Sequence, residues 1–430
     1  MKRVLSVVLL SMGLNAAMVQ NSVSNLLSTN PDIKSALNKF LAQKEEIKTA
    51  KAENLPVVNF NLQGGIAKSG LFKDDTPDQT YRYYKAAIIL TQNLFNGYGS
   101  VGKINFQRAK AVSYAFKYIQ TVNNITDKAL KSYIDVMKAE LLYKNGMENL
   151  QITKSILNKV KELYKGGMTT KSEVTKIESQ YYLAKSNVLV LKDKLVQAEN
   201  NFEKIFGFKP DIENMSFDAD LKLPFDVKSA YSLAVSNNPA VKSAKFYIKA
   251  LNEYQKTVDK NFYPKIDLQL TQNYNDVSER NPYDSVDDRF VASLNMTYNI
   301  FNGYQDKTNS QINKIKINEA LNSLEKIKRE IKANLYNAWD LKNTLEKRIK
   351  ELSKYKNYSN QTLNLYQKEF NMGRRTLLEL LTAQNDLYKA KNELIKAKFD
   401  LLYVKVKIHN LIGDLVDKIY GKKLFKGLID

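Results

Sequence analysis

Two stretches of this chain are nearly identical: NLFNGYGS at residues 93–100 and NIFNGYQD at residues 299–306. Gly97 and Gly303, the glycines of the two FNGY blocks, lie 206 residues apart. The same step relates two further pairs of glycines, Gly167 with Gly373 and Gly207 with Gly413. Landmarks that keep one spacing over such a distance predict a tandem duplication of roughly 200 residues.

Prolines near the start of each copy keep a slightly longer step. TNPDIKSA and NNPAVKSA place Pro31 opposite Pro239, and Pro56 lies opposite Pro264, in both cases 208 residues apart. The copies therefore differ by two residues between the second proline and the FNGY block. We expect four regions after residue 17: a first repeat over 18–207, a linker over 208–236, a second repeat over 237–413 and a C-terminal tail over 414–430.

Residues 1–17 have the pattern of a secretory signal peptide. Two basic residues in MKR precede an apolar run over 4–14, and Ala16 and Ala17 follow. The run is too short to span a bilayer as a helix. We expect export with cleavage after Ala16 or Ala17; the alternative is a buried N-terminal helix.

The composition leaves little material for site chemistry. The 430-residue chain has no cysteine, so it forms neither disulfides nor thiolate metal sites. Its single histidine, His409, lies in an amphipathic stretch, which favours a structural or solvated role over catalysis. The formal charge of +21 is spread along the chain at helical spacing instead of forming a nucleic-acid-binding patch. We expect no enzyme, no cofactor, no metal site and no nucleic-acid partner.

Proline and glycine positions predict very long helices. No proline occurs between residues 78 and 209 or after residue 282, and a proline inside a helix costs about 3 kcal/mol or more. Gly166 and Gly167 interrupt the first proline-free tract, and Gly373 interrupts the second. Each repeat therefore predicts a helix of roughly 60 residues, a tight turn, and a returning helix of roughly 40 residues.

Apolar residues in the second tract recur with a mean step of 3.5 residues, the period of a coiled coil. This period predicts left-handed supercoiling against a neighbouring helix. The stripe consists of Ile317, Leu321, Leu324, Ile327, Ile331, Leu335, Ala338, Leu341, Leu345, Ile349 and Leu352.

Each repeat also predicts one β-hairpin. Apolar and polar residues alternate in VVNFNLQ and KIDLQLTQ, and again before both FNGY blocks. Acidic loops at residues 73–78 and 276–288 join the strands. Amphipathic strands of about ten residues fit the wall of a transmembrane barrel, and a soluble sandwich with one solvated face fits them equally well. Because the smallest barrels have about eight strands, four strands in an exported chain favour a barrel shared among several chains.

The order of these parts resembles the TolC-like outer-membrane efflux proteins, also called outer membrane factors. The resemblance covers nearly the whole mature chain and rests on the following features in order: the Asn30-Pro31 and Asn238-Pro239 helix starts, LP and YP before the first strand of each hairpin, the aromatic Tyr133 and Trp339, the turns LYKGGMT and FNMGRRT, and LTAQNDLYKAKNELIKAKFDLL after the second turn.

This resemblance implies a fold that is mostly α with a small β part, in which long antiparallel coiled-coil hairpins and two β-hairpins occur per chain. It implies a homotrimer whose 12-stranded β-barrel, in contact with outer-membrane lipid, continues into an α-helical barrel in the periplasm. Such a protein would be the passive exit duct of a tripartite efflux pump or a type I secretion system. Its partners would be a periplasmic adaptor (membrane fusion) protein and an inner-membrane transporter of the RND or ABC type.

The resemblance also assigns positions in the duct. Phe95, Gly97, Phe301 and Gly303 would form the strand-to-helix joints, without chemistry of their own. The Gly167 and Gly373 turns would lie at the inner, periplasmic tip, where the family constricts.

Two carboxylates one turn apart commonly line that constriction. Glu379 matches the first of them, but Thr382 occupies the second position. A trimer would thus hold one ring of three glutamates, with weaker cation selectivity or divalent block than two acidic rings.

Polar links between neighbouring helices hold the closed tip in this family. Arg375 matches the arginine of that link, with Ser172 and Glu173 as its acceptors, whereas Phe370 replaces a tyrosine whose hydroxyl contributes a further link. The alternative is that Arg375 and Glu379 form an ordinary i,i+4 charge pair on a helix.

A second class of function remains open from the sequence. The chain could be a periplasmic coiled-coil adaptor or scaffold of an export system, although the duplicated layout with only two β-hairpins argues against this. The cargo is equally open, since drug efflux, metal efflux and protein secretion use ducts of one design.

Overall fold

The structure is a computed structural model that describes residues 18–69, 79–217, 221–277, 288–421 and 425. The expected signal peptide at 1–17 and the acidic loop at 73–78 lie outside the described residues, as does most of the acidic loop at 276–288.

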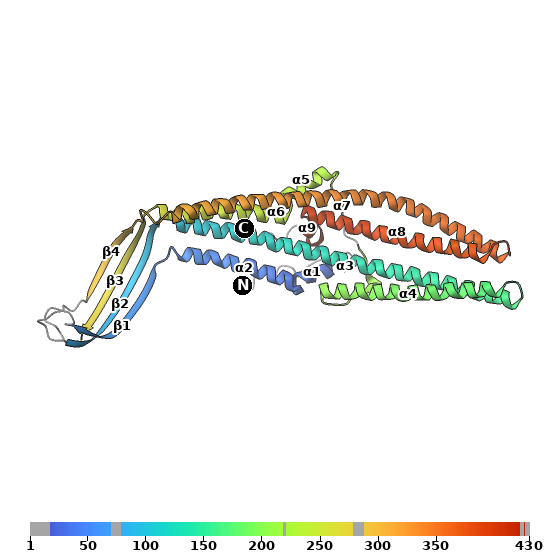
Figure 1. The fold of residues 1–430 in the computed structure, drawn as a ribbon, viewed down its shortest axis with the longest axis horizontal. Helices are drawn as coiled ribbons and strands as arrows, with labels where there is room; N and C mark the ends of the chain where they lie inside the picture. The colour runs from blue at the N-terminus through green and yellow to red at the C-terminus, as the bar shows by residue number, and fades with distance from the viewer. Residues whose placement is uncertain (1–17, 70–78, 218–220, 278–287, 422–424, 426–430) are drawn as a thin grey trace. The chain divides into compact units, whose positions relative to one another are not determined.

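Long helices dominate, accompanied by a single sheet among the described residues (Figure 1). In chain order the elements are α1 (Met18–Thr29), α2 (Pro31–Ala52), β1 (Val57–Ser69), β2 (Gln79–Asn96), α3 (Gly99–Lys165), α4 (Lys171–Phe206), the 3-10 turn η1 (Ile212–Asn214), α5 (Val227–Asn237), α6 (Pro239–Val258), the 3-10 turn η2 (Asp259–Phe262), β3 (Lys265–Val277), β4 (Arg289–Thr297), α7 (Gln305–Asn371), α8 (Leu377–Ile412) and α9 (Leu415–Tyr420).

The predicted repetition of elements is confirmed. Helices α3 and α7 have 67 residues each, and the returning helices α4 and α8 have 36 each. Helices α2 and α6 both begin at the prolines of the NP pairs, where the fixed φ of proline suits the first helical position. The preceding asparagines cap these helices: Asn30 Oδ1 accepts from the Asp32 amide at 3.0 Å, and Asn238 Oδ1 accepts from the Ala240 amide at 2.9 Å.

The predicted coiled-coil stripe on α7 is only partly correct. Leu335 and Leu345 are buried, but Leu321 and Leu341 are 46% and 49% exposed. The neighbour of α7 changes along its length, from α6 near Asn313 to α8 near Arg348. A single 3.5-residue stripe therefore does not face one partner helix throughout.

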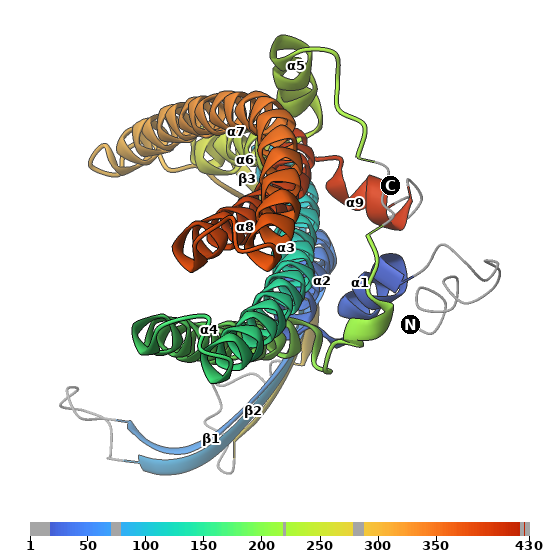
Figure 2. The ribbon, with the colours of Figure 1, turned by 90° about the vertical axis from the view of Figure 1, so that its right-hand side faces the viewer.

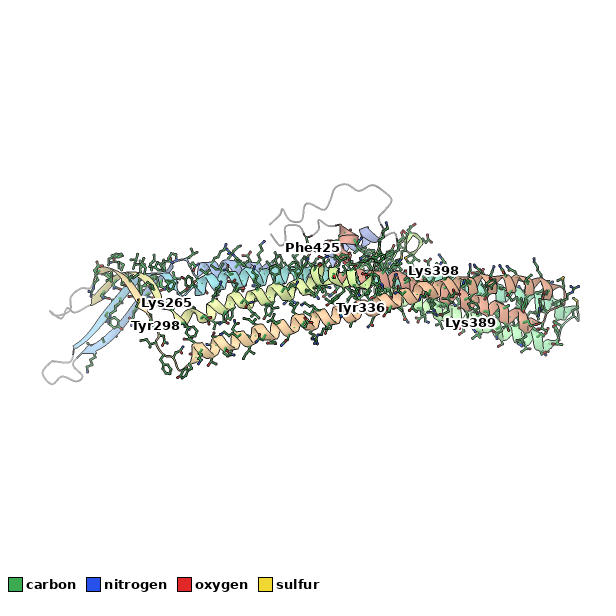
Figure 3. The ribbon with its side chains drawn as sticks, turned by 90° about the horizontal axis from the view of Figure 1, so that it is seen from above. Lys265, Tyr298, Tyr336, Lys389, Lys398 and Phe425 are labelled. Atoms are coloured by element: carbon green, nitrogen blue, oxygen red, sulfur yellow. The ribbon has the colours of Figure 1, made fainter. Side chains whose placement is uncertain are left out.

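The chain divides into two compact units, which are described separately. The unit formed by residues 38–115 and 243–325 contains the sheet, whose order is β1-β2-β3-β4 with every neighbouring pair antiparallel. The two predicted hairpins are thus joined through β2 and β3, with Leu90 opposite Leu270. Lys265 and Tyr298 lie at the end of the sheet where β3 begins and β4 ends (Figure 3).

Helix segments of this same unit follow the order α2, α3, α6, α7. Gln43 Nε2 of α2 donates to Gln107 Oε1 of α3 at 2.8 Å. The Ser113 hydroxyl of α3 donates to the carbonyl of Ser243 on α6 at 2.9 Å. Asn313 Nδ2 of α7 donates to the carbonyl of Leu251 on α6 at 3.1 Å. Each repeat therefore supplies two adjacent helices and two adjacent strands.

The other unit contains residues up to 37, 116–242 and 326–430. It holds the two helical hairpins, α3 with α4 and α7 with α8, together with α1, α5 and α9 (Figure 2). Helices α1 and α9 meet here, since the Tyr420 hydroxyl of α9 donates to the carbonyl of Val23 of α1 at 2.9 Å. His409 is buried, and its Nδ1 lies 2.9 Å from Asp414 Oδ1, which favours a structural role for this residue. Among the described helices, none combines the length and apolar character needed to cross a membrane.

Candidate functional site

The two hairpin turns share one backbone design. In the first turn the Gly167 amide donates to the Tyr164 carbonyl at 3.0 Å and the Met168 amide to the Leu163 carbonyl at 2.8 Å. In the second turn the corresponding bonds run from Gly373 to Phe370 at 3.0 Å and from Arg374 to Glu369 at 2.9 Å. This is the Schellman motif, which satisfies carbonyls at the end of a helix. It requires the left-handed backbone that both glycines adopt, with φ of 71° and 70°.

Both returning helices also begin with a threonine N-cap. Thr170 Oγ1 accepts from the Glu173 amide at 3.4 Å, and Thr376 Oγ1 accepts from the Glu379 amide at 3.3 Å. Only the second turn forms the reciprocal capping box, in which Glu379 Oε2 accepts from the Thr376 amide at 3.0 Å. In the first turn the Glu173 carboxylate instead accepts from the Thr169 hydroxyl.

Arg375 links the two helices of the second hairpin. Its Nε donates to Glu369 Oε2 at 2.6 Å, at the end of α7, and its Nη1 donates to Glu379 Oε1 at 2.7 Å, in the first turn of α8. Its guanidinium also lies 4.3 Å from the ring centroid of Tyr366. One arginine therefore closes the turn by two charge-assisted hydrogen bonds and one ring contact.

These bonds shift both ionisation equilibria. The bonds to Glu369 and then Glu379 raise the pKa of the Arg375 guanidinium. The Thr376 amide, followed by its hydroxyl and by Arg375, lowers the pKa of the Glu379 carboxyl below its ordinary value. Both groups are charged at neutral pH.

Within the single chain Arg375 bonds to Glu369 and Glu379 instead of Ser172 or Glu173, so the link to these two acceptors stays a prediction. Ser172 Oγ lies 2.8 Å from Thr170 Oγ1, and Glu173 bonds to Thr169. Glu369 and Glu379, on either side of the second turn, are closer to Arg375 along the chain and accept the hydrogen bonds of its guanidinium.

The uncharged side chains of Thr382 and Phe370 make other contacts near the second turn. The Thr382 hydroxyl donates back to the Leu378 carbonyl at 2.9 Å and lies exposed, one turn after Glu379. Phe370 is half-buried against an apolar core that lies under both turns. Its ring therefore packs, where a tyrosine would also present a hydroxyl.

That apolar core joins all four helices of the two hairpins. Its buried members are Ile156, Leu157 and Val160 of α3, Ile177 of α4, Leu363 of α7, and Leu377, Leu380, Leu381, Ala383 and Leu387 of α8. The two hairpins therefore pack against each other near their turns, and α8 contributes half of the buried residues of this core.

A polar seam between α3 and α8 continues from this core. Gln384 Nε2 donates to Thr153 Oγ1 at 2.8 Å, and Asn145 Nδ2 donates to Asn392 Oδ1 at 2.8 Å. Lys391 and Glu148 form an ion pair at 2.7 Å beside them. Sequence reasoning missed this seam, as it missed Glu369 and Tyr366, because only the fold brings these residues together. The capping box, in contrast, was readable in the sequence as Thr-x-x-Glu before an apolar run.

The two strand-to-helix joints share the same unusual backbone conformation. Gly97 and Gly303 have φ of 62° and 67°, and the tyrosines that follow them have φ of 64° and 63°. Two successive left-handed residues, the second of them not glycine, turn the chain sharply from strand to helix. Phe95 and Phe301 lie two residues before the glycines, as the repeated blocks require.

Among the residues that the structure describes, no group of three or more His, Asp or Glu side chains is placed to hold a metal ion. What the turns contain is two threonine caps and the ion pairs of Arg375 with Glu369 and Glu379.

The chain is similar to known proteins both in sequence and in fold. The model of the outer membrane efflux protein family matches it twice, over residues 22–208 and 230–414. The chain belongs to this family. Its members are outer-membrane efflux proteins, so the protein is located in the outer membrane, with a large helical part in the periplasm. The double match also confirms the internal duplication.

Individual relatives are distant in sequence but similar in fold. The outer membrane efflux protein BepC of Brucella suis biovar 1 (strain 1330) is 21% identical over 350 residues, covering 80% of this chain and 74% of BepC. The solved structure of CusC has a TM-score of 0.82 at 16% identity, covering 94% of this chain and 95% of CusC. The outer membrane protein VceC of Vibrio cholerae has a TM-score of 0.79 at 13% identity, covering 92% and 96%.

Proposed function

We propose that three copies of the chain form a passive duct through the outer membrane and the periplasm. Each copy would add its four strands to a 12-stranded barrel and its helices to a tunnel below it. The observation that carries this proposal is the exposed apolar face of the sheet, on which Phe60, Leu294 and Met296 are 66%, 66% and 69% exposed. Such a face, opposite a polar one that includes Asn61 and Asn295, suits a wall between lipid and water.

A planar lipid bilayer tests the duct directly. Purified protein added to the bilayer should produce discrete conductance steps, and light scattering in detergent should give the mass of three chains. Heat-denatured protein is the control for nonspecific leakage. A water-soluble monomer that forms no pores would contradict the proposal.

As partners we propose a periplasmic adaptor protein and an inner-membrane transporter of the RND or ABC type, which would deliver drugs, metals or a secreted protein. Membership in an efflux family supports a duct over the adaptor or scaffold alternative. Deleting the gene separates the cargo classes: retention of a fluorescent dye or a metal indicates efflux, whereas loss of an extracellular protein indicates secretion. A deletion strain without any transport defect would argue against this role.

The hairpin turns are proposed as the inner constriction of the duct, with Glu379 and Thr382 toward the passage and Arg375 as the latch that holds the turn closed. The Glu379 carboxylate already accepts from Arg375 and Thr376, which leaves it less free to bind cations. Conductance should therefore depend little on added Mg²⁺, and Arg375→Ala should raise the closed-state conductance. Unchanged closed-state conductance in Arg375→Ala would contradict the latch role of this arginine. Strong block of the conductance by Mg²⁺ would contradict a constriction with only one ring of three Glu379 carboxylates.

A further inference from the structure

The first hairpin contains a groove between α3 and α4, which run antiparallel along each other (Figure 1). Its volume is about 600 Å³, within the range of about 300–1,000 Å³ that is usual for small-molecule sites. Apolar residues that line it include Ile125 and Leu142 of α3 and Leu191 of α4, and Asn30 and Asp32 near the start of α2 line it as well. The groove therefore lies within one of the two units and has both apolar and polar walls.

Lysines set the charge of this groove. The lysines that line it are Lys128, Lys131 and Lys138 of α3 and Lys194 and Lys204 of α4. Two carboxylates, Asp32 and Asp135, also line it, so the five ammonium groups exceed the carboxylates by three. An excess of one sign of charge in a concave site concentrates ligands of the opposite sign. The groove therefore favours an anion.

Ion pairs within the chain account for two of these lysines. Asp135 lies 2.9 Å from Lys131 and 3.2 Å from Lys138, and Lys138 also lies 3.5 Å from Asp400 of α8. Among the residues that the structure describes, no carboxylate forms an ion pair with the other three lysines of the groove. These three side chains are exposed, so their ammonium groups can turn toward a bound anion.

The three lysines without an ion pair lie at two ends of the groove. Lys128 is 39 residues before Gly167, the glycine of the hairpin turn, and Lys204 is 37 residues after it, so both lie at the end far from the turn. Lys194 is ten residues before Lys204 on the same helix, which separates them by about 15 Å along its axis. A ligand that contacts all three lysines must therefore be extended.

The second repeat does not contain this set of lysines. At the step of 206 residues, the counterparts of the five lysines in α7 and α8 are Asn334, Asn337, Thr344, Asp400 and Asn410, of which none is basic. The second hairpin nevertheless has helices of the same lengths. A hairpin of this design therefore forms without cations at these positions, which favours a role of the five lysines in binding over a role in folding.

We propose that the groove binds a linear oligoanion, a chain that carries several carboxylate or phosphate groups. Lys128 and Lys204 bind anionic groups at one end of it, and Lys194 binds a group about 15 Å away. The apolar side chains of the groove contact the chain between these ends. The site lies within a single chain, so it goes beyond the proposed duct and does not depend on it.

The use of lysine instead of arginine bears on selectivity. The ammonium group of lysine is a point charge, whereas the guanidinium group of arginine is a planar fork that fits one carboxylate or phosphate through two hydrogen bonds. All the basic residues that line the groove in the described chain are lysines. The groove therefore selects the number and spacing of anionic groups more than their chemistry.

Binding of rhodamine-labelled pentaglutamate, followed by fluorescence anisotropy, tests the site. Five extended residues reach about 17 Å, enough to contact both ends of the groove. The purified full chain in a non-ionic detergent should bind this peptide at about 0.05 M NaCl and lose most of the binding at about 0.5 M NaCl, because salt screens exposed charges. Labelled pentaglutamine is the uncharged control and should not bind. Unlabelled linear polyphosphate of similar length should displace the pentaglutamate, whereas free glutamate should not.

Paired variants separate the groove from the general positive charge of the chain. Lys128→Gln with Lys204→Gln removes the cations at one end and should weaken the binding of pentaglutamate about tenfold. Lys185→Gln with Lys192→Gln is the matched control, because it removes the same charge from exposed positions of α4 outside the groove. It should change the dissociation constant by less than about twofold. Circular dichroism should give the natural melting temperature for both variants, since all four side chains are exposed.

The outcomes are distinct from those of the proposed function. Equal losses of affinity in the two paired variants would indicate attraction by net charge alone and overturn the site, as would failure of both pentaglutamate and polyphosphate to bind. Displacement by free glutamate at the same concentration would contradict an extended ligand. If both probes bind, the tighter one indicates whether the natural anion carries carboxylates or phosphates. A protein that binds them through the groove but forms no pores would contradict the duct and leave the site standing.

Discussion

The returning helices α4 and α8 are the same element of the two repeats, yet they are packed very differently. Both have 36 residues, begin at a threonine cap and end at a left-handed glycine. Helix α4 buries five residues, whereas α8 buries thirteen. Duplication preserved the length and the ends of the helix, but not the number of neighbours it contacts.

Position within the chain explains this difference. Helix α8 lies between α7, which it meets through the Arg348–Glu393 ion pair, and α3, which it meets through Glu148 and Lys391. Helix α4 packs on α3 through residues such as Lys161 and Glu178, and leaves its other side open, where Leu189 is exposed. A repeat at the end of a row has one neighbour fewer.

The largest expected difference between the two helices is in the core. Leu380→Ala removes a side chain that is 1% exposed, so it should cost about 2–5 kcal/mol. Its counterpart Val174 is half-buried and loses fewer methyl groups, so Val174→Ala should cost about 1 kcal/mol. Thermal unfolding followed by circular dichroism measures both. Equal shifts in melting temperature would contradict the difference in packing.

Substitution of the turn glycine should cost the same free energy of unfolding in both hairpins, in contrast to the unequal costs expected in the core. Both adopt a left-handed backbone with nothing within 4 Å of the point where a Cβ would lie. Gly167→Ala and Gly373→Ala should therefore each cost about 1–2 kcal/mol from backbone strain alone. Gly146→Ala is a contrasting variant, because its Cβ would lie 2.5 Å from Leu191 Cδ1 without a positive φ. A clear difference between the free-energy costs of the two turn variants would contradict a cost set by backbone strain alone.

The caps should differ by a smaller amount. Thr376→Ala removes a capping box and should cost about 1 kcal/mol. Thr170→Ala removes a longer bond without the reciprocal carboxylate contact, and should cost about 0.5 kcal/mol. Hydrogen exchange of the first-turn amides of α4 and α8 measures the loss of protection at each site. Serine at either position retains the acceptor, so the Thr→Ser variants should behave as the natural protein.

Most of the fold could be predicted from the positions of the prolines and glycines in the sequence. Prolines and glycines that recur at fixed steps set the ends of the helices, because proline cannot continue a helix and glycine alone adopts the left-handed turn without strain. The alternation around Phe60 and Leu294 identified the strands. The stripe predicted on α7 is only partly correct, with Leu321 and Leu341 exposed, because periodicity identifies one face of a helix but not a change of neighbour along it.

The partners in the turn were less predictable. Arg375 and Glu379 are only four residues apart, with Arg375 in the turn before the N-cap of α8 and Glu379 in the first turn of that helix, so the short spacing along the chain already favours their pairing. Glu369 is six residues before Arg375, and only the Schellman turn brings it to the guanidinium at 2.6 Å. The polar seam near Gln384 joins helices separated by more than 200 residues, a pairing that no local pattern encodes.

The smallest expected effect concerns the charge of Glu379. Only the second turn pairs its cap glutamate with an arginine, because Thr169 occupies the position equivalent to Arg375 in the first turn. The pKa of Glu379 is lowered in the folded protein, chiefly by the Thr376 amide, so the ionised carboxylate favours folding. This contribution is complete above the unfolded pKa and is lost as the pH falls through the folded value. First-turn amides of α8 should therefore be better protected in the natural protein than in Glu379→Gln at pH 7, and the difference should be lost only as the pH falls through the lowered pKa of Glu379, below the ordinary glutamate value of about 4.3. In Arg375→Ala the difference should shrink but persist, because the Thr376 amide is the larger cause. Its complete loss in Arg375→Ala would show that the arginine, and not the cap, sets the charge of this turn.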